Sequence, residues 1–147
     1  MHSLRVVFIT ICIACFIGFA QTGIADEALA IVVGRSSALQ NLSLETVKRV
    51  YLRKNLLDSA GTRWIPLNLP TDHELRQGFS VAMFKKLPED QEQYWNELYF
   101  QGINPPEVLA SEEAVLRFVD ITPGAIGYVR RRNVDDRVKV LKTISIP

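Results

Sequence analysis

The sequence predicts one α/β domain in which helices flank a mixed β-sheet. Short apolar runs rich in β-branched residues, typical of buried strands, alternate with segments whose apolar residues recur every three or four positions, typical of helices. Helical connections between strands favour parallel neighbours. An export signal at the N-terminus leaves residues 26–147 for the mature protein, enough for one domain with a hydrophobic core.

The N-terminus has the layout of a secretory signal peptide. Arg5 supplies the positive charge of a short basic region, and the uncharged apolar run 6–20 follows it. Gly23 and Ala25 are small residues at cleavage spacing, directly before the first acid, Asp26. We therefore expect residues 1–25 to be the signal peptide and the mature protein to be periplasmic or secreted.

Three alternatives exist for this segment: earlier cleavage after Ala20, an uncleaved membrane anchor and a lipoprotein start at Cys15. The apolar run is shorter than the roughly 20 residues that span a bilayer. The residues before Cys15, Cys12-Ile13-Ala14, do not match the leucine-small-small pattern typical of lipoproteins. Cleavage after Ala25 remains the favoured interpretation, with no membrane attachment afterwards.

The composition of residues 26–147 argues against several classes of function. Once Arg5 is removed, Lys and Arg balance Asp and Glu, so neither a nucleic acid nor an anionic membrane surface is an expected partner. Cys12 and Cys15 both lie in the signal peptide, and His73 is the only mature histidine. Zinc sites built from Cys and His, and Cys–His nucleophilic chemistry, are therefore excluded, and no metal or cofactor is expected.

The first half of the mature chain alternates strand and helix. The run 28–33, ended by Gly34, predicts a strand, and turn-like residues lead from it to a helix that Ser43 caps and that ends near residue 52. Alternation over 64–69 predicts a second strand. A helix follows in which Thr71 and Glu74 form a capping box.

The second half continues this order. Pro88 is expected to open a helix that Gly102 ends, and the sequence predicts a very short strand at residues 108–109. Ser111 starts another helix. The turn 122–124 precedes two closing strands, at residues 125–129 and 138–144.

Several segments together resemble a known family: Ala30-Ile31-Val32-Val33, Leu42-Ser43-Leu44-Glu45, Tyr51-Leu52, Leu75-Arg76-Gln77-Gly78-Phe79 and Thr122-Pro123-Gly124-Ala125-Ile126-Gly127-Tyr128-Val129. They resemble the phosphate-binding proteins of ABC transporters, and more closely the short proteins grouped with them as type 2 periplasmic-binding-protein-like domains. The similarity spans about residues 29–130, and 122–129 is its most specific part. It implies the fold of a single lobe, with half of the ligand cleft absent.

The resemblance also implies where an anion would bind. In that family a Ser-Gly-Thr-Arg motif at a helix start holds the anion, and His73, Glu74, Leu75 and Arg76 stand at the matching positions here. Arg76 alone matches the motif. Glu74 would place a carboxylate where the anion should sit and, through the capping box, would compete for its amides. We therefore expect a degenerate anion site.

Five residues are candidate ligand contacts, and each also has a structural interpretation. Arg76 is an anion clamp or an exposed residue that pairs with acids. His73 is a ligand contact or a surface helix residue, and Thr71 is a contact or a cap. Ser36 and Ser37 are contacts or turn residues.

These observations predict a non-enzymatic periplasmic solute-binding-like protein, related to phosphate ABC transporter receptors, that binds a small phosphate-like anion weakly. The alternative is an envelope interaction module or homodimer without a small ligand, whose open cleft face would expose apolar surface. A carboxylate-dependent hydrolase is a third class. The acid pairs Asp72 with Glu74 and Glu112 with Glu113 are, however, explained by first helical turns, and the sequence contains no catalytic triad, metal or P-loop motif.

Overall fold

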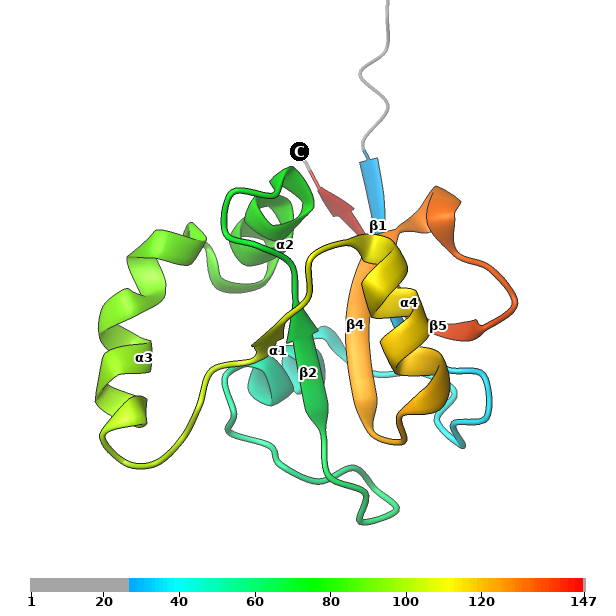
Figure 1. The fold of residues 1–147 in the computed structure, drawn as a ribbon, viewed down its shortest axis with the longest axis horizontal. Helices are drawn as coiled ribbons and strands as arrows, with labels where there is room; N and C mark the ends of the chain where they lie inside the picture. Colours follow the sequence, from blue (N-terminus) through cyan, green and yellow to red (C-terminus); the bar gives the residue numbers. More distant parts are fainter. Residues whose placement is uncertain (1–26, 147) are drawn as a thin grey trace, which may run out of the picture.

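The computed structural model describes residues 27–146, so the predicted signal peptide and its cleavage site lie outside the described residues. Strands and helices alternate along most of the described chain (Figure 1). No helix in this range is long and apolar enough to cross a membrane. The elements are β1 Glu27–Gly34, α1 Leu44–Tyr51, β2 Ile65–Asn68, α2 Glu74–Phe84, the 3₁₀ turn η1 Pro88–Gln91, α3 Glu92–Tyr99, β3 Glu107–Val108, α4 Glu112–Ile121, β4 Ala125–Arg130, the 3₁₀ turn η2 Arg131–Asn133 and β5 Val138–Ile146.

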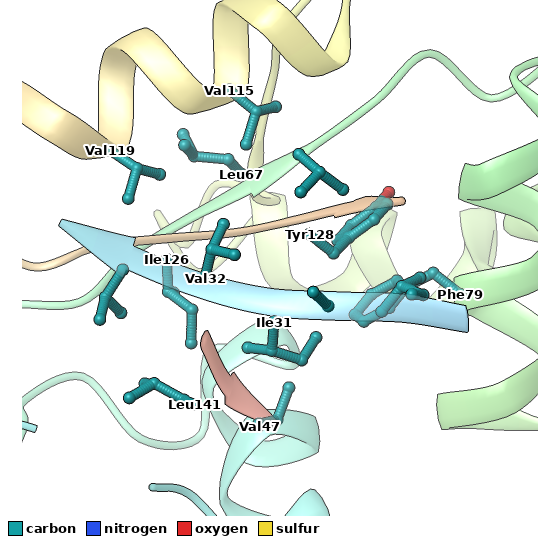
Figure 2. Close-up of a cluster of buried hydrophobic side chains, with 14 of the residues drawn as sticks. Ile31, Val32, Val47, Leu67, Phe79, Val115, Val119, Ile126, Tyr128 and Leu141 are labelled. Atoms are coloured by element: carbon teal, nitrogen blue, oxygen red, sulfur yellow. The ribbon is translucent and has the colours of Figure 1, made fainter. Parts of the chain in front are cut away.

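The strands form one open five-stranded sheet in the order β3-β2-β4-β1-β5. Strand β2 runs parallel to β3 and β4, whereas β1 runs antiparallel to both β4 and β5. The predicted mixed sheet is therefore confirmed. Its central strands are buried because α4 covers one face, through Val115 and Val119, and α1 covers the other, through Val47 (Figure 2).

A buried aromatic cluster joins α1 and α2 to the sheet. The rings of Phe79 and Tyr128 stack with centroids 4.1 Å apart, and the rings of Tyr51 and Phe79 are 4.7 Å apart. The Tyr51 hydroxyl donates to the Leu67 carbonyl at 2.9 Å, and the Tyr128 hydroxyl donates to Asn68 Oδ1 at 3.1 Å. Burial raises the pKa of Tyr128 to about 12. Both phenols are thus neutral, hydrogen-bonded parts of the core.

The start of α2 differs from the predicted capping box. His73, not Thr71, is the N-cap: its Nδ1 accepts a hydrogen bond from the Leu75 N–H at 3.1 Å. A turn closed by the bond from the His73 N–H to the Pro70 carbonyl precedes the helix and leaves Thr71 exposed. Glu74 is consequently the first helical residue, and its side chain contacts Arg130 rather than a backbone amide. The prediction of a Thr71–Glu74 box is wrong.

We expect His73→Ala to lower the free energy of unfolding by about 0.5–2 kcal/mol, because α2 loses its side-chain cap. Thr71→Ala should change it by less than about 0.5 kcal/mol, because Thr71 is exposed and does not cap the helix. Urea denaturation of the two variants measures both values. Equal losses, or a larger loss for Thr71→Ala, would contradict the assignment of His73 as the cap.

Candidate functional site

Parallel strands β2, β3 and β4 end at one edge of the sheet, which we call the carboxyl edge. Strand β2 ends at Asn68 and leads to α2, β3 leads to α4, and β4 ends at Arg130. The N-termini of α2 and α4 therefore lie at this edge too (Figure 1). Ligands of open α/β sheets bind outside the carboxyl ends of the strands, and helix N-termini favour anions there.

Arg76, in the first turn of α2, is half-buried at the carboxyl edge. Its Nε and Nη1 atoms are enclosed, and neither has a hydrogen-bond partner within residues 27–146. Burial lowers the pKa of Arg76, while the nearby hydroxyls of Tyr128 and Tyr51 oppose that shift. An enclosed donor without an acceptor costs about 1–3 kcal/mol. Arg76 forms no ion pair with an acid of the described chain, so its positive charge at this edge is available to a small oxyanion.

A second arginine at the same edge, Arg130, forms ion pairs with three carboxylates. The Arg130 Nε lies 2.6 Å from Glu27 Oε1, and the two terminal nitrogens of Arg130 contact Glu74 and Glu112. The four residues, which we call the Arg130 cluster, come from β4, β1, α2 and α4. Its ion pairs therefore connect four elements that are distant in sequence.

The Arg130 cluster places the protein's own carboxylates at two helix starts. Glu74 is the first residue of α2 and Glu112 the first residue of α4, where the helix dipole favours negative charge. Three carboxylates meet one guanidinium, and Arg132 adds a second positive charge at 3.1 Å from Glu27. The cluster therefore retains a net negative charge near the helix starts, which opposes the binding of an anion there.

Glu112 is the buried member of the Arg130 cluster, with a side chain 11% exposed. Burial alone would raise its pKa, but hydrogen bonds from the Arg130 N–H, the Asn133 amide and the Arg130 guanidinium together hold that pKa below the ordinary value of 4.5. Glu112 is therefore ionised at neutral pH. A carboxylate held in this state is poorly suited to act as a general acid.

The five candidate ligand residues do not meet in one site. Thr71, His73 and Arg76 lie at the carboxyl edge, whereas Ser36 and Ser37 follow the other end of β1. The separation arises because β1 runs antiparallel to β4: Leu29, near the start of β1, pairs with Arg130, and Val33, near its end, pairs with Ile126.

Ser36 and Ser37 line a hollow with a volume of about 390 Å³ at the end of the sheet opposite the carboxyl edge. Asp58, Trp64 and Asp120 also line it, and no lysine, arginine or histidine is among its described lining residues. Two carboxylates without a basic residue make this hollow unsuitable for an anion. Ser36 and Ser37 therefore cannot share an anion with Arg76.

The sequence offered only weak signals for the Arg130 cluster. Glu112 has the sequence pattern of an ordinary acid in a first helical turn, and the arginine triplet 130–132, followed closely by Asp135 and Asp136, is typical of a solvated turn. Glu27 carried no signal, because an acid at the start of a strand has many explanations. Within residues 27–146, no group of three or more His, Cys, Asp or Glu side chains is placed to hold a metal ion.

Comparison with known proteins bears on the fold alone. No protein-family model matches the sequence, and no curated protein matches it. Solved structures do match: a putative phosphate ABC transporter substrate-binding protein with bound phosphate from Clostridium perfringens (TM-score 0.64, 17% identity) and an ABC-type phosphate transport receptor from Vibrio cholerae (TM-score 0.65, 18% identity). PstS from Borrelia burgdorferi also matches (TM-score 0.61, 13% identity).

Each match covers a larger share of this chain than of the solved structure it is compared with. They cover 78–79% of this chain but only 44–46% of the three matched proteins, so the chain spans less than half of their length. The predicted fold of a single periplasmic-binding-protein lobe is confirmed.

Proposed function

We propose that this protein is a non-enzymatic, single-lobe solute-binding-like protein of the periplasm that binds a small phosphate-like oxyanion weakly at Arg76. The observation that carries the proposal is the half-buried guanidinium of Arg76, whose enclosed N–H groups have no acceptor within residues 27–146. It lies at the edge of the sheet where open α/β folds bind ligands. One matched protein is named as a phosphate transport receptor, and another, a putative phosphate ABC transporter substrate-binding protein, holds phosphate. The periplasmic location rests on the predicted signal peptide.

Two features make the binding weak. The net negative charge of the Arg130 cluster repels an oxyanion, since Glu74 and Glu112 already occupy the helix starts. This repulsion does not depend on the capping box inferred from sequence. In addition, the chain spans less than half of the matched receptors, and a second lobe would have to supply further contacts.

We expect inorganic phosphate to bind the wild-type domain with a Kd of about 1 mM or weaker. Arg76→Met should abolish this binding, because it removes the donors. Glu74→Gln should strengthen binding severalfold, because it removes one negative charge from the carboxyl edge with little change in shape. NMR titration with phosphate measures all three affinities.

Two outcomes would contradict the proposal. Micromolar binding by the wild type would mean that the site is not degenerate. Unchanged binding by Arg76→Met would place the anion elsewhere. Arg117→Met is the matched control, because Arg117 is an exposed arginine of α4 whose ion pair with Glu113 lies outside the Arg130 cluster.

The carboxylate-dependent hydrolase is disfavoured. Such an enzyme needs one carboxyl with a raised pKa to donate a proton. The pKa of Glu112, the most buried carboxyl at the carboxyl edge, is lowered instead. Glu27 and Glu74, the other two carboxylates of the cluster, are likewise ion-paired with Arg130.

A further inference from the structure

Residues 88–108 form an acidic segment at the flank of the domain, which we call the acidic arm. It comprises η1, α3, the following loop and β3. Its last element, β3, pairs with β2 at the edge of the sheet, whereas Figure 1 shows α3 at the periphery, away from the sheet. No residue of α3 is buried. A hollow of about 370 Å³ lies between the arm and α1. Tyr94 and Glu97 line it on the arm, and its other lining residues include Lys48 of α1, Leu52 directly after α1, and Lys86.

The arm is fixed at its base. The Tyr94 hydroxyl donates to the Leu52 carbonyl at 2.7 Å, and the Gln91 amide donates to Ser80 Oγ at 2.6 Å. Gly102, with φ of +79°, allows the chain to turn directly after α3. The arm is therefore an ordered projection rather than a loose loop.

The C-terminal end of α3 exposes an aromatic pair. Phe100 is 88% exposed and Tyr99 65% exposed, and their rings pack edge to face with centroids 6.2 Å apart. Aromatic side chains are common anchors of protein interfaces because they bury a large area at a small cost in side-chain entropy. Two adjacent aromatic rings left in water are unfavourable for an isolated monomer and suit a surface that a partner covers.

The charge of the arm specifies the chemistry of that partner. The arm contains Glu89, Asp90, Glu92, Glu97 and Glu107 but no lysine, arginine or histidine. None of these five carboxylates forms an ion pair within residues 27–146. Lys48 and Lys86 line the same hollow as Asp90 and Glu97 and offset part of this charge. The charged side chains of the arm itself are all acidic, so the arm keeps a net negative charge that attracts a basic surface.

The same charge disfavours two other occupants. A symmetric dimer through the arm would bring two acidic surfaces together, because an isologous interface joins the same patch of both copies. An anionic membrane surface would also repel the arm.

We propose that the acidic arm is the docking surface for a basic segment of another protein, with Tyr99 and Phe100 as its apolar anchors. The complementary segment presents lysine or arginine side chains around an apolar pocket that receives the two rings. This surface uses no residue of the proposed anion site, so it functions whether or not Arg76 binds phosphate.

The test is site-specific photocrosslinking of the full chain in the envelope of its own host. p-Benzoylphenylalanine replaces Phe100 in one variant and Ile121 in the control, because Ile121 is 79% exposed but lies at the end of α4, outside the arm. We expect a discrete protein adduct from position 100 that is about tenfold more abundant than any from position 121, with a crosslinked peptide rich in lysine and arginine.

Charge reversal makes the test specific. In the Phe100 crosslinking background, Glu92→Lys with Glu97→Lys should reduce the adduct about tenfold, since both carboxylates lie on α3. Glu45→Lys on α1, also exposed and without an ion pair in the described chain, should leave the adduct unchanged. Circular dichroism establishes that the variants are folded.

Several results would overturn the proposal: no excess of adduct at position 100, an adduct that survives charge reversal, or a contact peptide without basic residues. An adduct with a second copy of this chain or with lipid would also overturn it and identify a different occupant. Phosphate titration of Glu92→Lys with Glu97→Lys should match the wild type. Failure of docking is thereby distinguished from failure of the anion site.

Discussion

Arg130→Met is expected to lower the free energy of unfolding at neutral pH by about 3–5 kcal/mol, the loss typical when one partner of a buried ion pair is removed. The side chains of Arg130 and Glu112 are 13% and 11% exposed, so water cannot fully replace the missing guanidinium. Glu27 also loses the shorter of its two ion pairs, the one with Arg130, and keeps the one with Arg132. The variant therefore retains a buried, ionised Glu112. This carboxylate keeps only the hydrogen bonds from the backbone N–H of residue 130 and from the Asn133 side-chain amide.

The effect should depend on pH in a defined direction. Because the pKa of Glu112 is lower in the folded protein than its ordinary value of 4.5, its ionised form stabilises the fold above that value. This stabilisation is lost as the pH falls through the folded pKa. The difference in unfolding free energy between wild type and Arg130→Met should therefore be largest at neutral pH and should shrink progressively below pH 4.5.

Urea denaturation at several pH values measures this difference. Arg131→Met is the matched control, because Arg131 is the exposed neighbour in the same triplet and forms no ion pair in the described chain, and it should change stability by less than about 0.5 kcal/mol. If Arg130→Met proved as mild as Arg131→Met, or if its effect were independent of pH, the cluster would contribute little to stability.

The elements of the fold could be predicted because their signals are local. Strands β1 and β4 are continuous apolar runs, and α1 has apolar residues at helical spacing behind the Ser43 cap. The cap of α2 was misassigned for a local reason as well. The sequence Thr-Asp-His-Glu fits a Thr71 box, but the turn closed on Pro70 shifts the cap to His73.

The candidate site was harder to predict because it depends on long-range geometry. Arg130 and Glu27 are 103 residues apart in sequence, and nothing near either residue indicates the other. The direction of β1 was equally hidden, because a strand buried on both faces has the same apolar pattern in either direction. That direction places Ser36 and Ser37 at the far end of the sheet from Arg76.

The interaction-module interpretation predicts exposed apolar surface on the open cleft face, where a second lobe would close. The described carboxyl edge presents the charged Arg130 cluster together with Val108, the exposed last residue of β3. The exposed aromatic pair lies on α3. Ion pairs among its own residues make this edge compatible with water.

Gly124→Ala is the other substitution expected to have a large effect, with a loss of about 2–5 kcal/mol of unfolding free energy. Gly124 has φ of +82°, which costs a residue with a side chain about 1–2 kcal/mol. A Cβ at this position would also lie far inside the contact distance of the Arg63 carbonyl oxygen. That oxygen belongs to the backbone and cannot rotate away, so relief requires a shift of the chain that adds a further 1–3 kcal/mol, roughly the cost of overpacking.

The required shift would disturb the sheet itself. The Ile65 N–H donates to the Gly124 carbonyl at 2.9 Å, and Ile65 pairs with Ala125 where β2 and β4 begin their parallel register. Gly61→Ala is the matched control, since Gly61 also has φ of +82° but an added Cβ would meet no atom within 4 Å. Gly61→Ala should cost only the conformational term of about 1–2 kcal/mol. Urea denaturation gives the unfolding free energy of both variants, and the difference between them measures the cost of the contact between a side chain at residue 124 and the Arg63 carbonyl oxygen. Equal losses would show that the chain shifts at this contact without a cost in stability.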